Sequence, residues 1–175
     1  MNAPKNLPAH ALLLGGLLAT PIASATDKEK ILAGLSGFRE VPSISSPASG
    51  HFEAVIDRKA GTIAYDLSYS GLTGDVQQAH IHVGQRSVNG GVSVFLCQTE
   101  ASPDPTGLAP RCPQRGKVSG LAQSANMIAG PIVNQGVEPG QINELIAAIR
   151  AGVAYVNVHS STFPGGEVRG QLRLK

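Results

Sequence analysis

The sequence predicts an all-β fold: an antiparallel, Greek-key-like β-sandwich of about seven or eight strands, with one short helix near the C-terminal end. Its 175 residues suit a single domain. Its 21 glycines and 12 prolines, together with the absence of tryptophan, favour short strands and many turns. Short stretches of alternating apolar and polar residues recur between turn signals, and only one segment has the apolar period of a helix.

Residues 1–25 are predicted to be a secretory signal peptide. Lys5 precedes an apolar run at residues 11–19, and Ala23-Ser24-Ala25 has the small-x-small pattern that signal peptidase recognises. The run is shorter than the roughly 20 residues that span a bilayer comfortably, although an anchor that stays attached is the alternative. We therefore expect an exported protein, periplasmic or secreted, with one mature domain at residues 26–175 and no membrane span after cleavage.

Charge and motif content narrow the functions that the chain could have. The formal net charge of +2 falls to +1 when Lys5 is removed, and no basic cluster remains, so nucleic acid is not an expected partner. The sequence has no GxSxG, HExxH or Walker loop, and no GxGxxG after a strand. We therefore do not expect an enzyme, and copper-dependent redox activity is the weaker alternative.

Cys97 and Cys112 are the two cysteines of the chain and are expected to form a disulfide in an oxidising compartment. The bond would close the Pro-rich excursion "CQTEASPDPTGLAPRC", and a loop of about 15 residues is stabilised by about 3 kcal/mol in this way. A metal-binding or redox role for the two thiols is the alternative, but the pair lacks a CxxC spacing.

The N-terminal half of the mature chain contains the clearest hairpin. "ILAGLSG" is a first strand candidate and is followed by a loop at residues 39–50 that is rich in proline and serine. "GHFEAVID" and "TIAYDLSYSGL" then flank the turn "RKAG". Ile63, Tyr65, Leu67 and Tyr69 share one face of the second strand, which should face the core.

Further strands are predicted at 79–83, 92–97 and, more weakly, 116–122, with a turn at Asn89-Gly90-Gly91 between the first two. Residues 122–139 give no clear prediction. In "GQINELIAAIRAG" four apolar residues at i, i+3, i+4 and i+7 form the stripe of a helix, which should end near Gly152. The stripe consists of Ile142, Leu145, Ile146 and Ile149.

Two final strands, "VAYVNVHS" and "GEVRGQLRLK", are separated by the tight turn "TFPGG". In the first strand, Tyr155, Asn157 and His159 share one face while Val156 and Val158 take the core. In the second, alternation places Glu167 and Arg169 on an exposed face, where they could pair with each other or across strands.

Several separate stretches resemble one known family: "LSGFREVP", "SPASG", "YSGLTG", "AHIH", "AGVAYVNVHS" and "PGGEVRGQL". Together they are similar to the CHRD domain, named from chordin and found in many bacterial exported proteins, and the likeness covers residues 31–174. The resemblance implies an extracellular or periplasmic β-rich module. The sequence departs from the common pattern at Ser43, at Ser161 and in the disulfide insertion, and none of these departures involves a histidine of the motifs.

Three histidines are candidate metal ligands. His80 and His82 alternate with Ile81, so both side chains project from one face of a strand and could bind one ion together. His159 ends a later strand and could converge on them. The arrangement looks like part of the copper site of copper/zinc superoxide dismutase, but the likeness covers only "HIH" and a later histidine. No matching zinc loop is present, so dismutase activity is not implied.

Three neutral imidazoles suit copper or zinc, and copper binds such sites more tightly. We therefore predict a copper ion as the cofactor, with zinc as the alternative. A metal-bound histidine usually donates its other ring N–H to a carboxylate or carbonyl, and Asn157, Glu167 and Glu40 are the candidates for this role.

Two other interpretations of the histidines remain open. They could form a hydrogen-bonded cluster that only braces the loop between the last two strands, or an imidazole could act in catalysis. In the first case the domain would be a structural or interaction module without a metal, and its partner would be an envelope or matrix protein.

Overall fold

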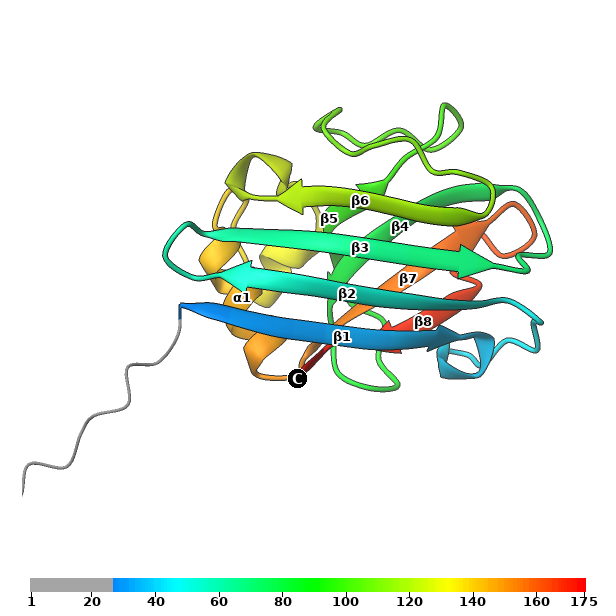
Figure 1. Cartoon of the computed structure of the whole chain (residues 1–175), viewed down its shortest axis with the longest axis horizontal. Helices are drawn as coiled ribbons and strands as arrows, with labels where there is room; N and C mark the ends of the chain where they lie inside the picture. The colour runs from blue at the N-terminus through cyan, green and yellow to red at the C-terminus, as the bar shows by residue number, and fades with distance from the viewer. Residues whose placement is uncertain (1–26) are drawn as a thin grey trace, which may run out of the picture.

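Nine strands, each antiparallel to its neighbours, make up residues 27–175, the part of the chain that this computed structural model describes (Figure 1). The predicted signal peptide, residues 1–25, lies outside the described residues. The strands are β1 (Lys28–Ser36), β2 (Ser49–Asp57), β3 (Thr62–Ser70), β4 (Val76–Val83), β5 (Gly91–Cys97), β6 (Gly116–Ala122), β7 (Ala154–Ser160), β8 (Val168–Gln171) and β9 (Arg173–Leu174).

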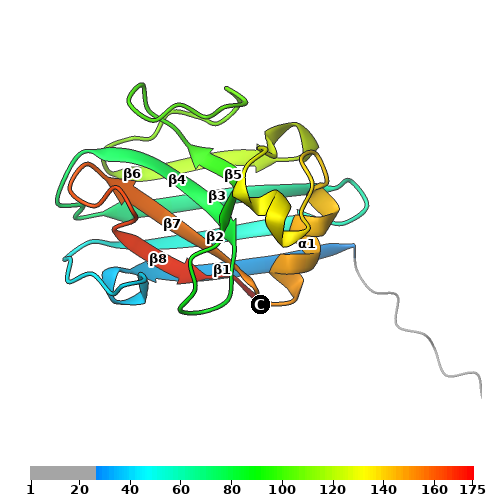
Figure 2. The same ribbon diagram turned by 180° about the vertical axis from the view of Figure 1, so that it is seen from behind.

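The strands lie in two layers that face each other. β1, β2, β3 and β6 form one layer, and β4, β5, β7 and β8 form the other, as Figures 1 and 2 show from opposite sides. The layers are also joined edge to edge, because Ser36 of β1 pairs with Arg169 of β8, so the sheet runs β5-β4-β7-β8-β1-β2-β3-β6 and nearly closes on itself. The predicted antiparallel all-β fold is confirmed, with one continuous sheet where two separate sheets were expected.

The core fills the space between the layers and follows the alternation of the strands. On β3 the predicted apolar face is buried and packs in the main core, while Ala64 and Asp66 on the other face are not buried. On β4 the core contains Val76, Ala79, Ile81 and Val83. The histidines between them therefore point away from the core, towards the outer face of the second layer.

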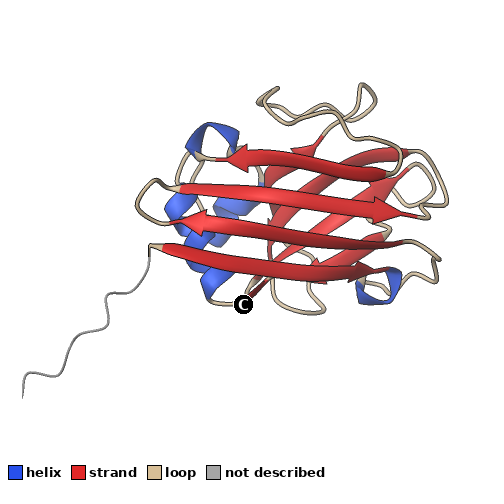
Figure 3. Cartoon of the chain, viewed as in Figure 1, coloured by secondary structure: helices blue, strands red, loops and turns tan. Residues whose placement is uncertain are grey.

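The predicted helix is confirmed as α1 (Ile142–Arg150), and its four apolar residues are all buried. The chain leaves the helix at Gly152, whose φ of 73° is a left-handed conformation that favours glycine at a helix end. Three short 3₁₀ helices complete the fold: η1 (Gly37–Arg39), η2 (Ser124–Asn126) and η3 (Pro131–Gln135). Two of these, η2 and η3, lie in the segment 122–139. Figure 3 shows that α1, η2 and η3 gather at one end of the sheet.

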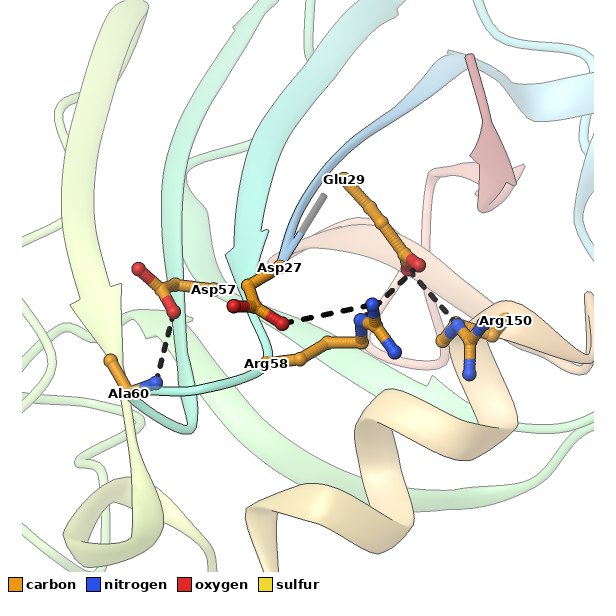
Figure 4. Close-up of polar contacts among 6 residues, drawn as sticks. All are labelled: Asp27, Glu29, Asp57, Arg58, Ala60 and Arg150. Carbon is orange, nitrogen blue, oxygen red and sulfur yellow. Dashed lines mark hydrogen bonds and ion pairs between the residues drawn. The ribbon is translucent and has the colours of Figure 1, made fainter. Parts of the chain in front are cut away.

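Ion pairs attach α1 to that end of the sheet (Figure 4). Glu29 of β1 binds Arg150 of α1, with 3.0 Å between carboxylate oxygen and Nε, and Arg58 of the β2–β3 turn at 3.4 Å. Arg58 also lies 3.9 Å from a carboxylate oxygen of Asp27. These ion pairs join α1 to the start of β1 and to the β2–β3 turn.

The predicted disulfide between Cys97 and Cys112 is confirmed and closes the excursion after β5. Asp104 organises the interior of this loop, because its carboxylate accepts backbone N–H groups of Thr106, Leu108 and Ala109. The hydroxyl of Tyr69 donates to the carbonyl of Pro113 and so joins the end of the excursion to β3. Among residues 27–175, none of the helices has the length and apolar character needed to cross a membrane.

Candidate metal centre

Strand pairing brings the three predicted ligands together. β4 pairs with β7 in a register that sets His80 opposite Asn157 and His82 opposite Tyr155, and His159 lies opposite Gln78. One nitrogen from each of the three imidazoles can be chosen so that all three nitrogens lie within 4.8 Å of one another. Side chains 79 residues apart in the sequence therefore share one cluster on the outer face of the sheet, as the alternation of β4 and β7 requires.

The cluster is buried although it lies outside the main core. The exposed fractions of His80, His82 and His159 are 2%, 6% and 6%. Phe95 of the neighbouring β5 covers His80 edge-on, with 4.3 Å between the ring centroids, and Tyr155 stacks on His82 at 4.6 Å. Three imidazoles this far removed from water need partners within the protein for their ring nitrogens.

Two backbone carbonyls fix the orientation of two of the rings. His82 Nδ1 lies 3.0 Å from the carbonyl oxygen of Gly90, and His159 Nδ1 lies 2.9 Å from that of Pro164. A carbonyl oxygen only accepts, so Nδ1 must carry the proton in both rings. In the neutral imidazoles Nε2 therefore keeps its lone pair, and a metal ligand needs such a nitrogen.

The other ring nitrogens of the three histidines have few hydrogen-bond partners. His80 Nδ1 lies 3.2 Å from His159 Nε2 and can donate its proton to it. The Nε2 atoms of His80 and His82 are buried and, among the described residues, have no hydrogen-bond partner. The cluster thus contains buried lone pairs that a cation would use and that a purely structural hydrogen-bond network leaves unpaired.

Burial keeps the three imidazoles neutral. Desolvation lowers the pKa of His80 well below its ordinary value, and the neighbouring rings of His159 and His82 lower it further. Desolvation also lowers the pKa of His82 to about 4, against the effect of its hydrogen bond to Gly90. The pKa of His159 is lowered by burial as well, and its hydrogen bond to Pro164 opposes this shift. At neutral pH all three are in the form that binds metals.

Arg169, Tyr155 and His82 form a stack of three side chains. The guanidinium carbon of Arg169 lies 3.4 Å from the centre of the Tyr155 ring, whose other face covers His82. Arg169 also donates to the carbonyls of Gln85 and Val88 and so holds the loop after β4. That loop ends in Gly90, whose N–H donates to the Tyr155 hydroxyl and whose carbonyl accepts from His82.

The three predicted partners of the histidines occupy different places. Asn157 is buried within the cluster, with its Oδ1 atom 3.0 Å from His159 Nε2. Glu40 is buried next to Asn157, which forms a side-chain hydrogen bond with it. The carboxylate of Glu167 instead accepts from Ser46 Oγ at 2.6 Å and from the N–H of Thr73 at 2.9 Å, so it joins two loops.

The predicted exposed face of β8 is wrong, because Glu167 and Arg169 are 0% and 2% exposed. Alternation places both on the outer side as predicted, but the loops after β1 and β4 cover that side and supply hydrogen-bond partners. The backbone acceptors of the histidines, Gly90 and Pro164, were also missed from the sequence. The Asn-Gly-Gly and Pro-Gly-Gly stretches mark turns, but nothing in them indicates an acceptor for a histidine.

Burial raises the pKa of Glu40 to about 7. The positive charge of Arg169, a backbone hydrogen bond at Val41 and the side chain of Asn157 act in the opposite direction. Glu40 therefore lies near both Arg169 and Asn157, and burial opposes its ionisation more than these two neighbours favour it.

A family model described as the CHRD domain matches residues 31–172. The chain belongs to the CHRD domain family. The match confirms the resemblance seen in the separate motifs and includes all three histidines of the cluster. A search of the curated proteins found no match, and neither did a search of the solved structures. Family membership establishes the domain without assigning it a biochemical role.

Gly90 of this CHRD domain should not tolerate a side chain. A Cβ atom at this position would lie 1.6 Å from the carbonyl oxygen of Val83, so Gly90→Ala must displace the loop and remove the acceptor of His82. We expect a loss of at least about 2 kcal/mol in the free energy of unfolding, because a buried donor loses its partner. Denaturant unfolding measures this loss. Gly165→Ala is the control, since a Cβ there meets no atom within 4 Å, and equal stability of the two variants would contradict the interpretation.

The stability of the CHRD domain should depend on pH through His82. The pKa of His82 is about 4 when folded and has an ordinary value of 6.5, so the unfolded chain takes up a proton first as the pH falls. Stability that is fully present above pH 6.5 is therefore lost towards pH 4. Between pH 7 and pH 5, with EDTA present, the wild type should lose about 2 kcal/mol more than His82→Gln in urea unfolding. Parallel losses in the two proteins would show that His82 is not the titrating group.

Proposed function

We propose that this CHRD domain is an exported metal-binding module in which His80, His82 and His159 bind one ion, copper in the first place and zinc in the second. The observation that carries the proposal is the pair of buried Nε2 atoms, on His80 and His82, that have no hydrogen-bond partner. A structural cluster would leave these atoms unsatisfied at about 1–3 kcal/mol each, whereas a bound cation would use their lone pairs.

The ligand chemistry favours copper. Neutral imidazoles suit copper and zinc, and among divalent ions copper binds nitrogen sites of this kind most tightly. The rings need no deprotonation at neutral pH, because burial lowers the pKa of all three. The disulfide between Cys97 and Cys112 supports an exported location, since such bonds persist in oxidising compartments.

Metal titration tests the proposal. We expect Cu(II), and more weakly Zn(II), to raise the melting temperature of the metal-free protein, with about 2.7 kcal/mol of added stability at 100 times the dissociation constant. The variants His80→Ala and His82→Ala should lose this effect. His51→Ala is the matched control, because His51 lies on the exposed side of β2 and should leave the titration unchanged. Equal responses of the wild type and His80→Ala would end the proposal.

A second candidate function is an interaction module of the envelope or extracellular matrix. Its support is the exposure of Phe38 and Val88, which are 71% and 47% exposed, on two loops tied together by a 2.9 Å hydrogen bond from Asn89 to the carbonyl of Val41. If this function holds, a protein or polymer captured from envelope extract should remain bound in the presence of a chelator and be lost on Phe38→Ser. Capture that EDTA abolishes would instead favour the metal-binding function.

A further inference from the structure

We propose that the side-chain oxygen of Asn157 is a fourth ligand of the ion, and that Glu40 is the residue that turns this oxygen towards it. The inference rests on the proposed metal-binding function and defines the site as three nitrogens and one oxygen. It assigns Asn157 to the ligand set and gives Glu40 a positioning role.

Asn157 occupies the middle of the cluster. It lies opposite His80 across the β4–β7 pairing and two residues from His159 on the same face of β7. Asn157 is 3% exposed, and its Oδ1 lies 3.0 Å from His159 Nε2. Its side chain is therefore buried beside His159, on the strand position opposite His80.

The contact between Asn157 and His159 brings two atoms with lone pairs together. Nδ1 of His159 carries the ring proton because it donates to the carbonyl of Pro164, so Nε2 of the neutral ring has only a lone pair. The amide oxygen also has only lone pairs. Two acceptors thus face each other at 3.0 Å, an arrangement that a cation bound by both would stabilise.

One distance in the cluster fits a shared ion directly. Two ligands held at about 2.0–2.1 Å from a tetrahedral ion lie about 3.3 Å apart. The separation between Asn157 Oδ1 and His159 Nε2 is 3.0 Å, within a few tenths of an ångström of this spacing.

Glu40 determines which end of the amide faces the histidines. Its carboxylate accepts a hydrogen bond from Asn157, and only the Nδ2 end of the amide can donate one. A Cβ atom built at Gly166 would lie 2.6 Å from Glu40 Oε1 and 2.7 Å from Asn157 Nδ2, so both side chains border the same backbone position. With Nδ2 held by the carboxylate, Oδ1 must point to the rings. Without it, the amide could turn and present an NH₂ group to the ion.

Cu(II) binding and electron paramagnetic resonance test the inference. Asn157→Leu keeps the approximate volume and removes the oxygen, so we expect at least tenfold weaker Cu(II) binding and altered g and hyperfine values. Asn157→Asp should bind Cu(II) at least as tightly as the wild type, because a carboxylate oxygen replaces the amide oxygen. Glu40→Leu removes the acceptor of Asn157 Nδ2, so it should weaken binding about tenfold and change the spectrum, as loss of a ligand-orienting partner typically costs 10–100-fold in affinity.

The controls separate this inference from the proposed function. Asn143→Leu, on the exposed face of α1, should bind Cu(II) like the wild type. If the wild type binds Cu(II) through His80 and His82 but Asn157→Leu and Glu40→Leu leave affinity and spectrum unchanged, the fourth ligand is overturned and the three-histidine site stands. If the wild type binds neither Cu(II) nor Zn(II), both proposals fail. Should Asn157→Leu not fold, Asn157→Asp and Glu40→Leu decide the question.

Discussion

Each imidazole buried on the outer face of β4 and β7 has two ring nitrogens that need partners, and this requirement determines how the loops around the cluster are placed. An unsatisfied buried polar atom destabilises a protein by about 1–3 kcal/mol, so the loops must bring acceptors to the rings. Gly90 and Pro164 supply them from two different loops. The partners they provide are directional, because each leaves a lone pair on the opposite ring nitrogen. The same contacts that stabilise the fold therefore prepare the rings to bind a cation.

Arg169 connects this cluster to the rest of the second layer. A buried guanidinium must use its donors and balance its charge, and here it binds Asn89 and two loop carbonyls, covers Tyr155, and has Glu40 as its nearby opposite charge. Tyr155 passes this support to His82 by stacking and to Gly90 through its hydroxyl. Arg169 and Tyr155 therefore both bind the loop after β4. These contacts explain how a loop can hold the carbonyl of Gly90 in place as the acceptor of His82.

Alternation along single strands was enough to predict which residues share a face, and it succeeded for β3, for β7 and for the helix stripe. It also indicated that His80 and His82 would share a face, because the side chains of residues two apart on a strand point to the same side. It failed for Glu167 and Arg169, since alternation gives the side of a sheet but not what covers it. Coverage depends on loops at 38–48, 84–90 and 160–166, whose paths are set by contacts between distant residues. The carbonyls of Gly90 and Pro164 could not be predicted for the same reason, as every residue has one.

The composition of the cluster would also limit which ions it could select. Its imidazoles are neutral, the pKa of the nearby Glu40 is about 7, and Arg169 carries a positive charge. These groups would offer a cation little net electrostatic attraction, so binding would depend on the strength of the bonds to nitrogen. Calcium and magnesium, which bind mainly oxygen and favour carboxylates, would gain little from such a site. Copper and zinc would gain most, because imidazole is a strong ligand for both and strands, not loops, carry all three histidines.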